Sequence, residues 1–409
     1  MKFNAYKMED ALEYIIDYRG KTPKKSDKGI KTLSAKSVRD GYIDYSQCYF
    51  ISRDEYEKFM VRGFPKVGDV LLTTEAPLGV TARLDRDDVA LAQRLLTLRG
   101  KTGILDTGYL YYYLRSPLGQ RKLLERQTGT TVTGIKQAEF RRIVIEIPEE
   151  KIQKRIASIL EPIDAKIKLN NRINENLEQQ ARALFQSMFI NSEERYSWES
   201  GVFADLIEST LGGDWGKESP TGNNTEMIYC IRGADIPEVR AGNKGKMPTR
   251  YILPKNYAAK HLLPGDIVVE ISGGSPTQST GRVAAISQSL LDRYDKGMVC
   301  TNFCKAIKPK TGYSMFVYYY WQYLYDRNVF FLYENGTTGI KNLDLSGFIT
   351  TEEIVIPPAH LVKHFDDYCQ IIFDQIFANG LENEQLATIR DTLLPRLMSG
   401  EIDVSQLSI

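Results

Sequence analysis

The sequence predicts an α+β protein with two mixed α/β domains separated by two long antiparallel helices of coiled-coil type. Three observations predict this fold: the same motifs recur in the same order in both halves, strand signals open each half, and a helical apolar period closes it. Such a duplication implies a pseudo-twofold relation between the halves. The expected segments are a first mixed domain at 1–148, a central helix at 149–192, a second mixed domain at 193–357 and a C-terminal helix with tail at 358–409.

The duplication is clearest around the two Ile-Pro dipeptides. The segments IEIPEEKIQKRIASILEPIDAKI, from Ile145, and IVIPPAHLVKHFDDYCQIIFDQI, from Ile354, keep a constant offset of 209 residues. Three upstream segments recur in order: TGTTVTGIK (128–136) with NGTTGIK (335–341), TGYLYYYL (107–114) with TGYSMFVYYYW (311–321), and FPKVGDVLLT (64–73) with LLPGDIVVE (262–270). The chain therefore contains two copies of a unit of roughly 200 residues.

Local signals indicate strands and helices inside each copy. Gly68-Asp69 and Gly265-Asp266 are turn dipeptides, and β-branched apolar runs that favour strands follow them. Short runs that end at the two Ile-Pro dipeptides also favour strands, whereas the Tyr-rich runs favour helices.

Each copy ends in a long helical pattern with one apolar seam. The expected seam residues are Ile152, Ile156, Ile159, Ile163, Ile173, Leu177 and Leu184, and then Leu361, Phe365, Tyr368, Ile372, Leu386, Ile389 and Leu393. Asn170 and Asn379 fall on the seam, where a polar residue weakens packing and fixes register, although a solvent-facing position is the alternative. Pro162 and Gly380 interrupt the pattern, and Pro162 would either begin a new helix or kink a continuous one.

Composition indicates a cytoplasmic, reduced protein. The five cysteines are an odd number spread over 409 residues, which fits free thiols better than disulfides. We expect neither a signal peptide nor a transmembrane helix. The net charge of 53 − 52 = +1 argues mildly against a nucleic-acid binder, although the charge is unevenly distributed.

Sequence motifs for chemistry are absent. The pair His360 and His364 lacks the glutamate of a HExxH metal site, and Cys300 with Cys304 lacks a partner pair for zinc. The segment GGDWGKES has the wrong spacing for a phosphate-binding P-loop. The Asn/Asp-Pro-Pro-Tyr/Phe run of amino-methylating DNA methyltransferases is also missing. We expect no catalytic residues and no metal ligands.

Basic and amide-bearing loops in both halves are the candidate DNA contacts. From Arg19 to Arg39 the chain has eight bases and one acid, and from Arg232 to Arg250 five bases and two acids. Lysines, hydroxyls and Gly-rich turns hold phosphate, whereas Gln, Asn and Arg can read purine edges. The candidates are Arg19, Lys21, Thr22, Lys24, Lys25, Thr73, Thr74, Gln93, Arg94, Thr130, Thr131, Lys136, Lys217, Arg232, Lys244, Lys246, Ser275, Gln278, Asn302, Thr337, Thr338 and Lys341. A merely solvated polar loop is the alternative for each one.

The order of strand-rich domain, GTTxxGIK-type loop, strand-Pro and helix KIQKRIASILEPIDAKIKLNNRINENLEQQARALFQSMF, repeated, resembles the specificity subunits of Type I restriction-modification enzymes. TTEAPLGVTARL (73–84), QRLLTLRG (93–100) and the ending LLPRLMSGEIDV (393–404) add to the resemblance, which covers essentially the whole chain.

The resemblance implies a non-catalytic subunit of a prokaryotic complex. Each mixed domain would be a target recognition domain that reads one half of a split double-stranded DNA sequence, and the helices would fix the gap between the halves. The implied partners are two methyltransferase subunits and, in the full complex, motor-nuclease subunits. S-adenosylmethionine, ATP and Mg would belong to those partners, with no cofactor in this chain. A nuclease or methyltransferase acting alone and a free-standing DNA-binding regulator are the rival hypotheses.

Overall fold

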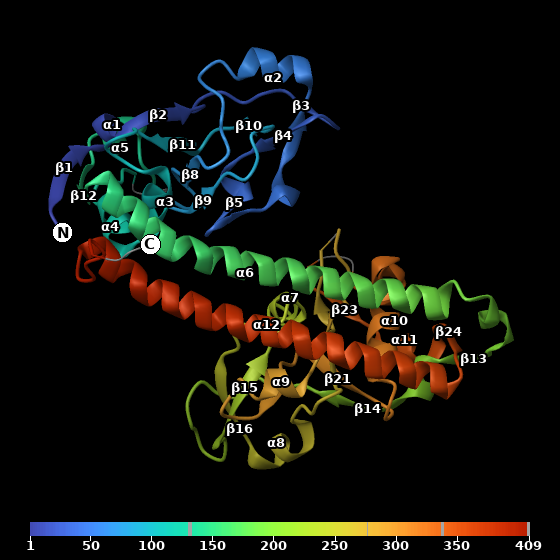
Figure 1. Ribbon diagram of the computed structural model, residues 1–409. Coiled ribbons are helices and arrows are strands. Elements are labelled where there is room, and N and C mark those ends of the chain that lie inside the picture. The colour runs from blue at the N-terminus through green and yellow to red at the C-terminus, as the bar shows by residue number, and fades with distance from the viewer. Residues whose placement is uncertain (130–132, 276, 337–338, 407–409) are drawn as a thin grey trace. The chain divides into compact units, whose positions relative to one another are not determined.

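The structure is a computed structural model that describes residues 1–129, 133–275, 277–336 and 339–406. The chain divides into two compact units, which are described separately. Unit 1 comprises Met1–Ala165 and Ala387–Ile409, and unit 2 comprises Lys166–Leu386. The predicted α+β fold class is confirmed (Figure 1). The segment boundaries expected from the sequence remain a prediction.

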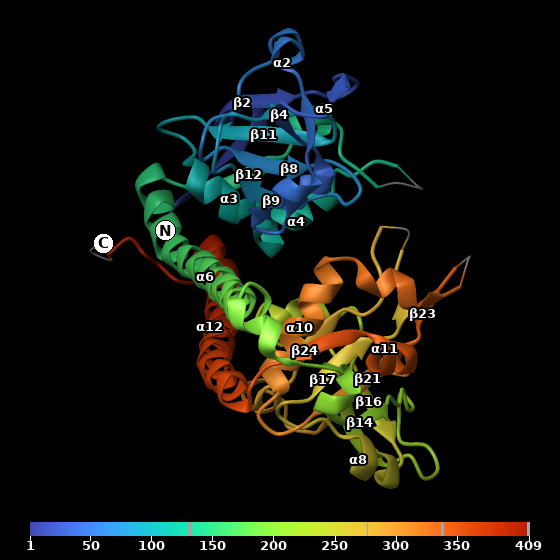
Figure 2. The same cartoon turned by 90° about the vertical axis from the view of Figure 1, so that its right-hand side faces the viewer.

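Unit 1 is built on two four-stranded sheets. The first is antiparallel and has the order β2 (Leu12–Asp17), β11 (Leu95–Gly100), β8 (Val70–Thr73) and β9 (Thr81–Arg83). The second has the order β10 (Ala90–Leu91), β4 (Ile30–Leu33), β7 (Tyr49–Ile51) and β3 (Lys25–Ser26). Figure 2 shows β8 and β11 side by side, with the Tyr-rich α3 (Thr107–Arg115) and α4 (Pro117–Leu124) below them. The remaining elements are β1 (Phe3–Lys7), α1 (Met8–Ala11), β5 (Val38–Arg39), β6 (Tyr42–Ile43), α2 (Arg53–Phe59), α5 (Gln137–Arg141) and β12 (Val144–Pro148), which pairs with β1.

Unit 2 repeats the antiparallel four-stranded sheet and differs in its other sheets. Its antiparallel sheet has the order β14 (Ile207–Gly212), β21 (Cys304–Pro309), β17 (Ile267–Glu270) and β19 (Val283–Ala285). A second sheet is formed by β16 (Thr249–Ile252), β15 (Glu226–Ile231) and β20 (Met298–Cys300). A third is formed by β18 (Ser272–Gly273), β23 (Lys341–Leu343) and β22 (Glu334–Asn335). The remaining elements are β13 (Glu199–Val202), α7 (Ile236–Arg240), α8 (Pro254–Lys260), α9 (Gln288–Leu291), the Tyr-rich α10 (Ser314–Asp326), α11 (Leu345–Thr351) and β24 (Glu353–Ile356), which pairs with β13.

The repeated Gly-Asp dipeptides share one structural role. The Asp69 carboxylate accepts a hydrogen bond from the Lys66 backbone N–H at 2.8 Å and forms an ion pair with Arg99 of β11 at 2.7 Å. In unit 2 the Asp266 carboxylate accepts from the Leu263 N–H at 2.8 Å and pairs with Lys308 of β21 at 3.1 Å. Each aspartate therefore closes the turn before its strand and neutralises a base of the neighbouring strand. These dipeptides recur for a structural reason.

The helices α6 (Glu150–Phe185) and α12 (Ala359–Ser399) are both continuous. Pro162 and Gly380 lie inside them, so Pro162 does not begin a new helix, and a kink at Pro162 stays a prediction. Proline removes only one helical hydrogen bond, and the packing on either side of it outweighs that loss. Gly380 serves close packing, because a Cβ there would lie 1.9 Å from the carbonyl oxygen of Gly242.

The long helices belong to the hydrophobic cores of the units. In unit 1, Ile152, Ile156 and Leu160 of α6 pack with Leu394 and Leu397 of α12. In unit 2 the core includes Phe365, Ile372 and Phe377 of α12 together with Phe185 of α6. Of the other expected seam residues, Ile159, Ile163, Ile173, Leu177, Leu184, Leu361, Leu386 and Leu393 are half-buried.

Two residues of the expected seam are exposed. Tyr368 is 41% exposed and Ile389 is 49% exposed, so their placement in the seam is wrong. For Tyr368 the reason is that α12 packs against the domain core of unit 2 as well as against α6, and its buried stripe follows both surfaces. Asn170 and Asn379 are both buried, and neither faces solvent.

Candidate nucleic-acid interface

A two-residue turn leads into the same strand of each unit. In unit 1 the Ala92 N–H donates to Leu33 O at 2.7 Å, and β11 begins after two intervening residues. In unit 2 the Thr301 N–H donates to Ile231 O at 3.0 Å, and β21 begins after two intervening residues. The turns themselves are Gln93-Arg94 and Asn302-Phe303. The backbone hydrogen bonds therefore make Gln93 equivalent to Asn302, and Arg94 equivalent to Phe303, in the two copies of the repeat.

In unit 1 this turn meets the loop that follows β8. The Thr74 N–H donates to Arg94 O at 3.0 Å, and the Glu75 carboxylate contacts the Arg94 guanidinium at 2.7 Å and that of Arg19 at 3.7 Å. The Ile135 N–H donates to Thr74 O at 2.9 Å, so Ile135, near the end of the TGTTVTGIK segment, reaches the same place. Arg94 has a φ of 69°, a left-handed backbone conformation that residues other than glycine rarely adopt. Segments from four parts of the sequence thus gather around Glu75.

In unit 2 the equivalent turn meets the equivalent loop. The N–H groups of Ile271 and Ser272 donate to Phe303 O at 2.9 and 3.2 Å. The Leu343 N–H donates to Ile271 O at 2.8 Å, which brings the hairpin of β22 and β23 to the turn. The Phe303 ring is 58% exposed at this edge. The backbone hydrogen bonds at the two turns correspond, whereas the side chains at equivalent positions differ.

The structure corrects the equivalence of the two GIK segments. Hydrogen bonding equates Ile135 with Leu343, because their N–H groups bind corresponding carbonyls. The following residues, Lys136 and Asp344, each occupy the N-cap of a short helix. Lys136 and Lys341 are therefore not equivalent, because strand pairing sets the register and the local sequence does not.

Several predicted contacts are held by the protein itself. Thr73 and Thr74 are buried and offer little free surface, and their role as DNA contacts stays a prediction. The Thr73 hydroxyl donates to Pro77 O at 2.6 Å and accepts from the Val80 N–H at 2.9 Å, which closes the loop after β8.

Two predicted cations have carboxylate partners. The Arg232 guanidinium donates two hydrogen bonds to the Asp235 carboxylate, at 2.9 and 3.0 Å. The Lys341 ammonium lies 2.7 Å from the Glu334 carboxylate. Burial alone would raise the pKa of Glu334, but hydrogen bonds from Lys341 and Thr280 outweigh burial and lower it. These cations hold loops in place and retain little uncompensated charge.

The other predicted contacts vary in exposure. Exposed ones are Arg19, Lys21, Thr22, Lys24, Lys25, Arg94, Lys136, Lys217, Lys246, Gln278 and Asn302, and half-buried ones are Gln93, Lys244 and Ser275. Thr130, Thr131, Thr337 and Thr338 lie outside the described residues.

Sequence reasoning missed two aromatic residues of unit 2. Phe303 carries no motif, and its position became evident only from the pairing that equates it with Arg94. Trp215 lies in the loop after β14, where the Arg250 guanidinium carbon is 3.8 Å from the indole ring centroid. Arg250 also forms an ion pair with Glu218 at 3.0 Å. The Asp-Trp-Gly sequence beside Lys217 was a usable signal for this exposed aromatic residue.

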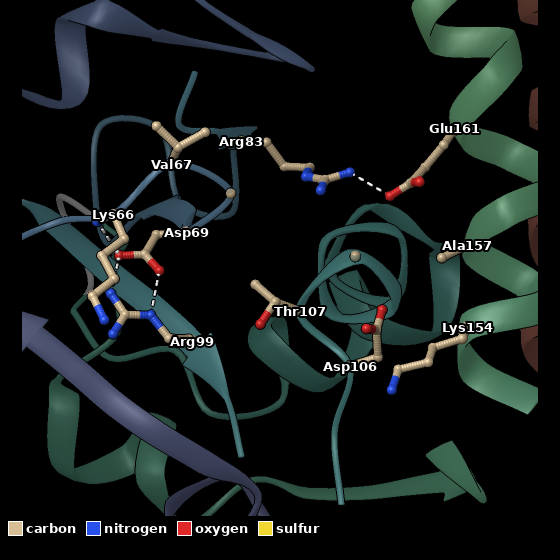
Figure 3. A pocket seen from close by; sticks show the side chains of 12 residues that line it. Lys66, Val67, Asp69, Arg83, Arg99, Asp106, Thr107, Lys154, Ala157 and Glu161 are labelled. Carbon is tan, nitrogen blue, oxygen red and sulfur yellow. Dashed lines mark hydrogen bonds and ion pairs between the residues drawn. The ribbon is translucent and has the colours of Figure 1, made fainter. Parts of the chain in front are cut away.

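A cavity of about 550 Å³ lies in unit 1 between the sheet, α3 and the first turns of α6. Figure 3 shows the two arginines that line it, each directed to a carboxylate: Arg99 to Asp69, and Arg83 to Glu161 at 2.5 Å. Lys154 on the rim pairs with Glu150 at 3.1 Å. The ion pair between Arg83 and Glu161 thus joins the sheet to α6 across the cavity. Because the arginines are paired, the cavity presents little free charge to an anion.

Within the described ranges, no group of three or more His, Cys, Asp or Glu side chains could hold a metal ion. Burial raises the pKa of the Cys230 and Cys304 thiols to about 12, which keeps both neutral at ordinary pH. None of the helices described here combines the length and apolarity that a membrane span requires.

Comparisons with known proteins agree with the resemblance seen in the sequence. A family model described as the Type I restriction modification DNA specificity domain matches residues 6–179. The specificity subunit of the Type I restriction enzyme MjaIX of Methanocaldococcus jannaschii is 25% identical over 383 residues, covering 87% of this chain and 82% of its own. That of the HindI enzyme of Haemophilus influenzae is 21% identical over 403 residues, covering 78% and 82%. The solved S subunit of a Type I system from M. genitalium has a similar fold, with a TM-score of 0.56 over 97% of this chain and 96% of its own at 14% identity.

Proposed function

Because this chain belongs to the specificity subunits of Type I restriction-modification enzymes, we propose that its two mixed domains each read one half of a bipartite double-stranded DNA target. The observation that carries the proposal is the pair of equivalent turns before β11 and β21, one in each unit. The same backbone frame presents Gln93-Arg94 in one unit and Asn302-Phe303 in the other. Two copies of one frame with different side chains suit a protein that reads two different half-sites.

Around these turns, exposed basic side chains supply the positive charge for phosphate contact. The segment after β2 carries Lys21, Lys24 and Lys25, all exposed, and begins at Arg19 beside Glu75. Lys217 is exposed in the corresponding loop after β14. Phosphate contacts of this kind set orientation and register on the duplex, and base contacts then select the sequence.

The two long helices would set the gap between the half-sites and dock two methyltransferase subunits. Motor-nuclease subunits would join in the full restriction complex. The chain itself would be non-catalytic, and S-adenosylmethionine, ATP and Mg would belong to its partners. The sequence supports this division of labour, because it lacks the motifs of the methyltransferase and of the motor.

The test is DNA methylation by the cognate methyltransferase with and without this chain. We expect methylation at one bipartite motif only when the chain is present. Site-specific methylation by the methyltransferase alone would refute the proposal, as would cleavage or methylation by this chain alone. Replacing residues 1–148 with the equivalent domain of a relative should change one half of the motif, and a change in both halves would contradict the modular reading of the target.

A further inference from the structure

We propose that the turn before β11 and the turn before β21 discriminate the bases of the two half-sites, with Arg94 selecting a guanine and Phe303 selecting a thymine. This inference rests on the proposed function and specifies which side chains carry it. It also accounts for an arginine and a phenylalanine at one equivalent position, because the two half-sites then differ there.

Arg94 is held as a reading residue would be. Its side chain is 53% exposed, and the Glu75 carboxylate contacts its Nε at 2.7 Å. Its backbone is also fixed, because Arg94 O accepts the Thr74 N–H at 3.0 Å. A guanidinium held along its Nε edge can extend its terminal nitrogens toward O6 and N7 of guanine, the pairing that arginine makes in the major groove. Glu75 would be the positioning residue.

Phe303 has no such polar partner for its side chain. Its carbonyl oxygen accepts from the N–H groups of Ile271 and Ser272, so the backbone is anchored while the ring stays 58% exposed. Exposed apolar residues are common on proteins, so exposure alone would decide nothing. The second observation is the equivalence with Arg94, which places the ring where unit 1 has its fixed guanidinium. In the major groove an apolar side chain contacts the C5 methyl group of thymine.

The surroundings of both turns suit a duplex. Arg19 contacts Glu75 and leads into the exposed lysines after β2. In unit 2, Asn302 is exposed in the turn itself, and Gln278 is exposed on the loop after β18, the strand that begins at Ser272. Cationic and amide side chains around each turn can contact phosphates and orient the duplex. The few side chains held in place at the turn can then contact the bases.

The experiment selects bound sequences from a library of random double-stranded DNA, using the full-length chain with its cognate methyltransferase at fixed salt. We expect Arg94→Ala to abolish a roughly 5- to 150-fold preference for guanine at one position of one half-site. We expect Phe303→Ala to abolish an about 3- to 4-fold preference for thymine at one position of the other half-site. Within each variant, the unaltered half-site reports that the protein is folded and bound.

Arg121→Ala is the matched control for Arg94→Ala, since Arg121 is also exposed and also contacts a glutamate, Glu125, at 4.0 Å. Tyr196, 95% exposed, gives the control for the aromatic residue, Tyr196→Ala. Both controls should keep the wild-type motif. The inference is overturned if Arg94→Ala or Phe303→Ala leaves every base preference intact, or weakens binding to all sequences equally. A wild-type complex without any bipartite motif would instead refute the proposed function.

Discussion

Asn379 donates a hydrogen bond from its Nδ2 to the Oδ1 of Asn174, over 2.8 Å, from a position 205 residues away in the chain. A second bond of this type runs from Asn170 Nδ2 to Asn383 Oδ1 at 3.0 Å. The offset of the duplication, 209 residues, takes Asn170 to Asn379 and Asn174 to Asn383, so it exchanges the two bonded pairs. In unit 2 the antiparallel pairing of α6 and α12 is thus marked by four buried amides related by a local pseudo-twofold axis.

Removing one of these amides should destabilise the protein. Asn379→Ala leaves the buried oxygen of Asn174 and the amide of Gln375 without their Asn379 partner. We expect the free energy of unfolding to fall by about 1–3 kcal/mol. Urea denaturation followed by circular dichroism measures it, with the exposed Asn223→Ala as control. A double-mutant cycle with Asn174→Ala should give a coupling energy of about 0.5–3 kcal/mol, and additive losses would contradict a direct bond.

The Gly-Asp ion pairs should matter for stability in both units. Asp69→Ala leaves Arg99 without its buried carboxylate, and we expect a loss of about 3–5 kcal/mol. We expect a smaller loss for Asp266→Ala, because Lys308 approaches both Asp266 oxygens with a single ammonium group, whereas the Arg99 guanidinium makes two parallel hydrogen bonds with Asp69. The matched control is Asp88→Ala, since Asp88 pairs with Arg86 at the surface, where such pairs contribute less than about 1 kcal/mol. Thermal unfolding of the three variants decides the question. Equal small effects would show that the duplicated aspartates are dispensable.

Changing Lys21, Lys24 and Lys25 together to alanine should weaken binding to all DNA sequences similarly. The three side chains are exposed, and each lost phosphate contact lowers the slope of log affinity against log salt by about one unit. Titration of a target duplex and of a random duplex at several salt concentrations measures both quantities. An unchanged slope would show that these lysines form a solvated loop and do not contact phosphate.

The helices can be tested as a ruler by lengthening both together. An insertion in α6 alone, near Asn170, would displace the amides on one helix only, so equal insertions are needed after Ala165 and after Leu386. Four residues extend each helix by about 6 Å, close to one turn. We expect the unspecified gap in the methylated motif to lengthen by about one to two base pairs, with both half-sites kept. Methylation mapping reads the gap, and an active variant with an unchanged gap would show that the helices do not measure DNA.

Alkaline pH should destabilise the fold through its buried thiols. Burial raises the pKa of Cys230 and of Cys304 from 9.0 to about 12, and it also raises the pKa of Cys300 and of Cys369. The folded state therefore keeps protons that the unfolded state releases above pH 9, and stability is present below pH 9 and falls as pH rises toward 12.

Urea unfolding at several values between pH 8 and pH 11 should show this decline, with a smaller slope for Cys230→Ala. In the native protein at pH 8, a thiol-specific reagent should modify the half-buried Cys48 before the four buried cysteines. Stability that increased above pH 9 would contradict the assignment.

The sequence by itself determined the duplication, the fold class and the absence of catalytic motifs. Periodicity is local information, so the long helices and the strand after each Gly-Asp turn were predictable from it, as was the polar interruption at Asn170 and Asn379. Only the tertiary structure decided which residues correspond across the copies. Ile135 matches Leu343 and Arg94 matches Phe303 because strand pairing between distant segments sets the register. It also decided that Thr73 closes a loop and Thr74 is buried while Phe303 stays exposed, since burial depends on what packs above a residue and not on its neighbours in sequence.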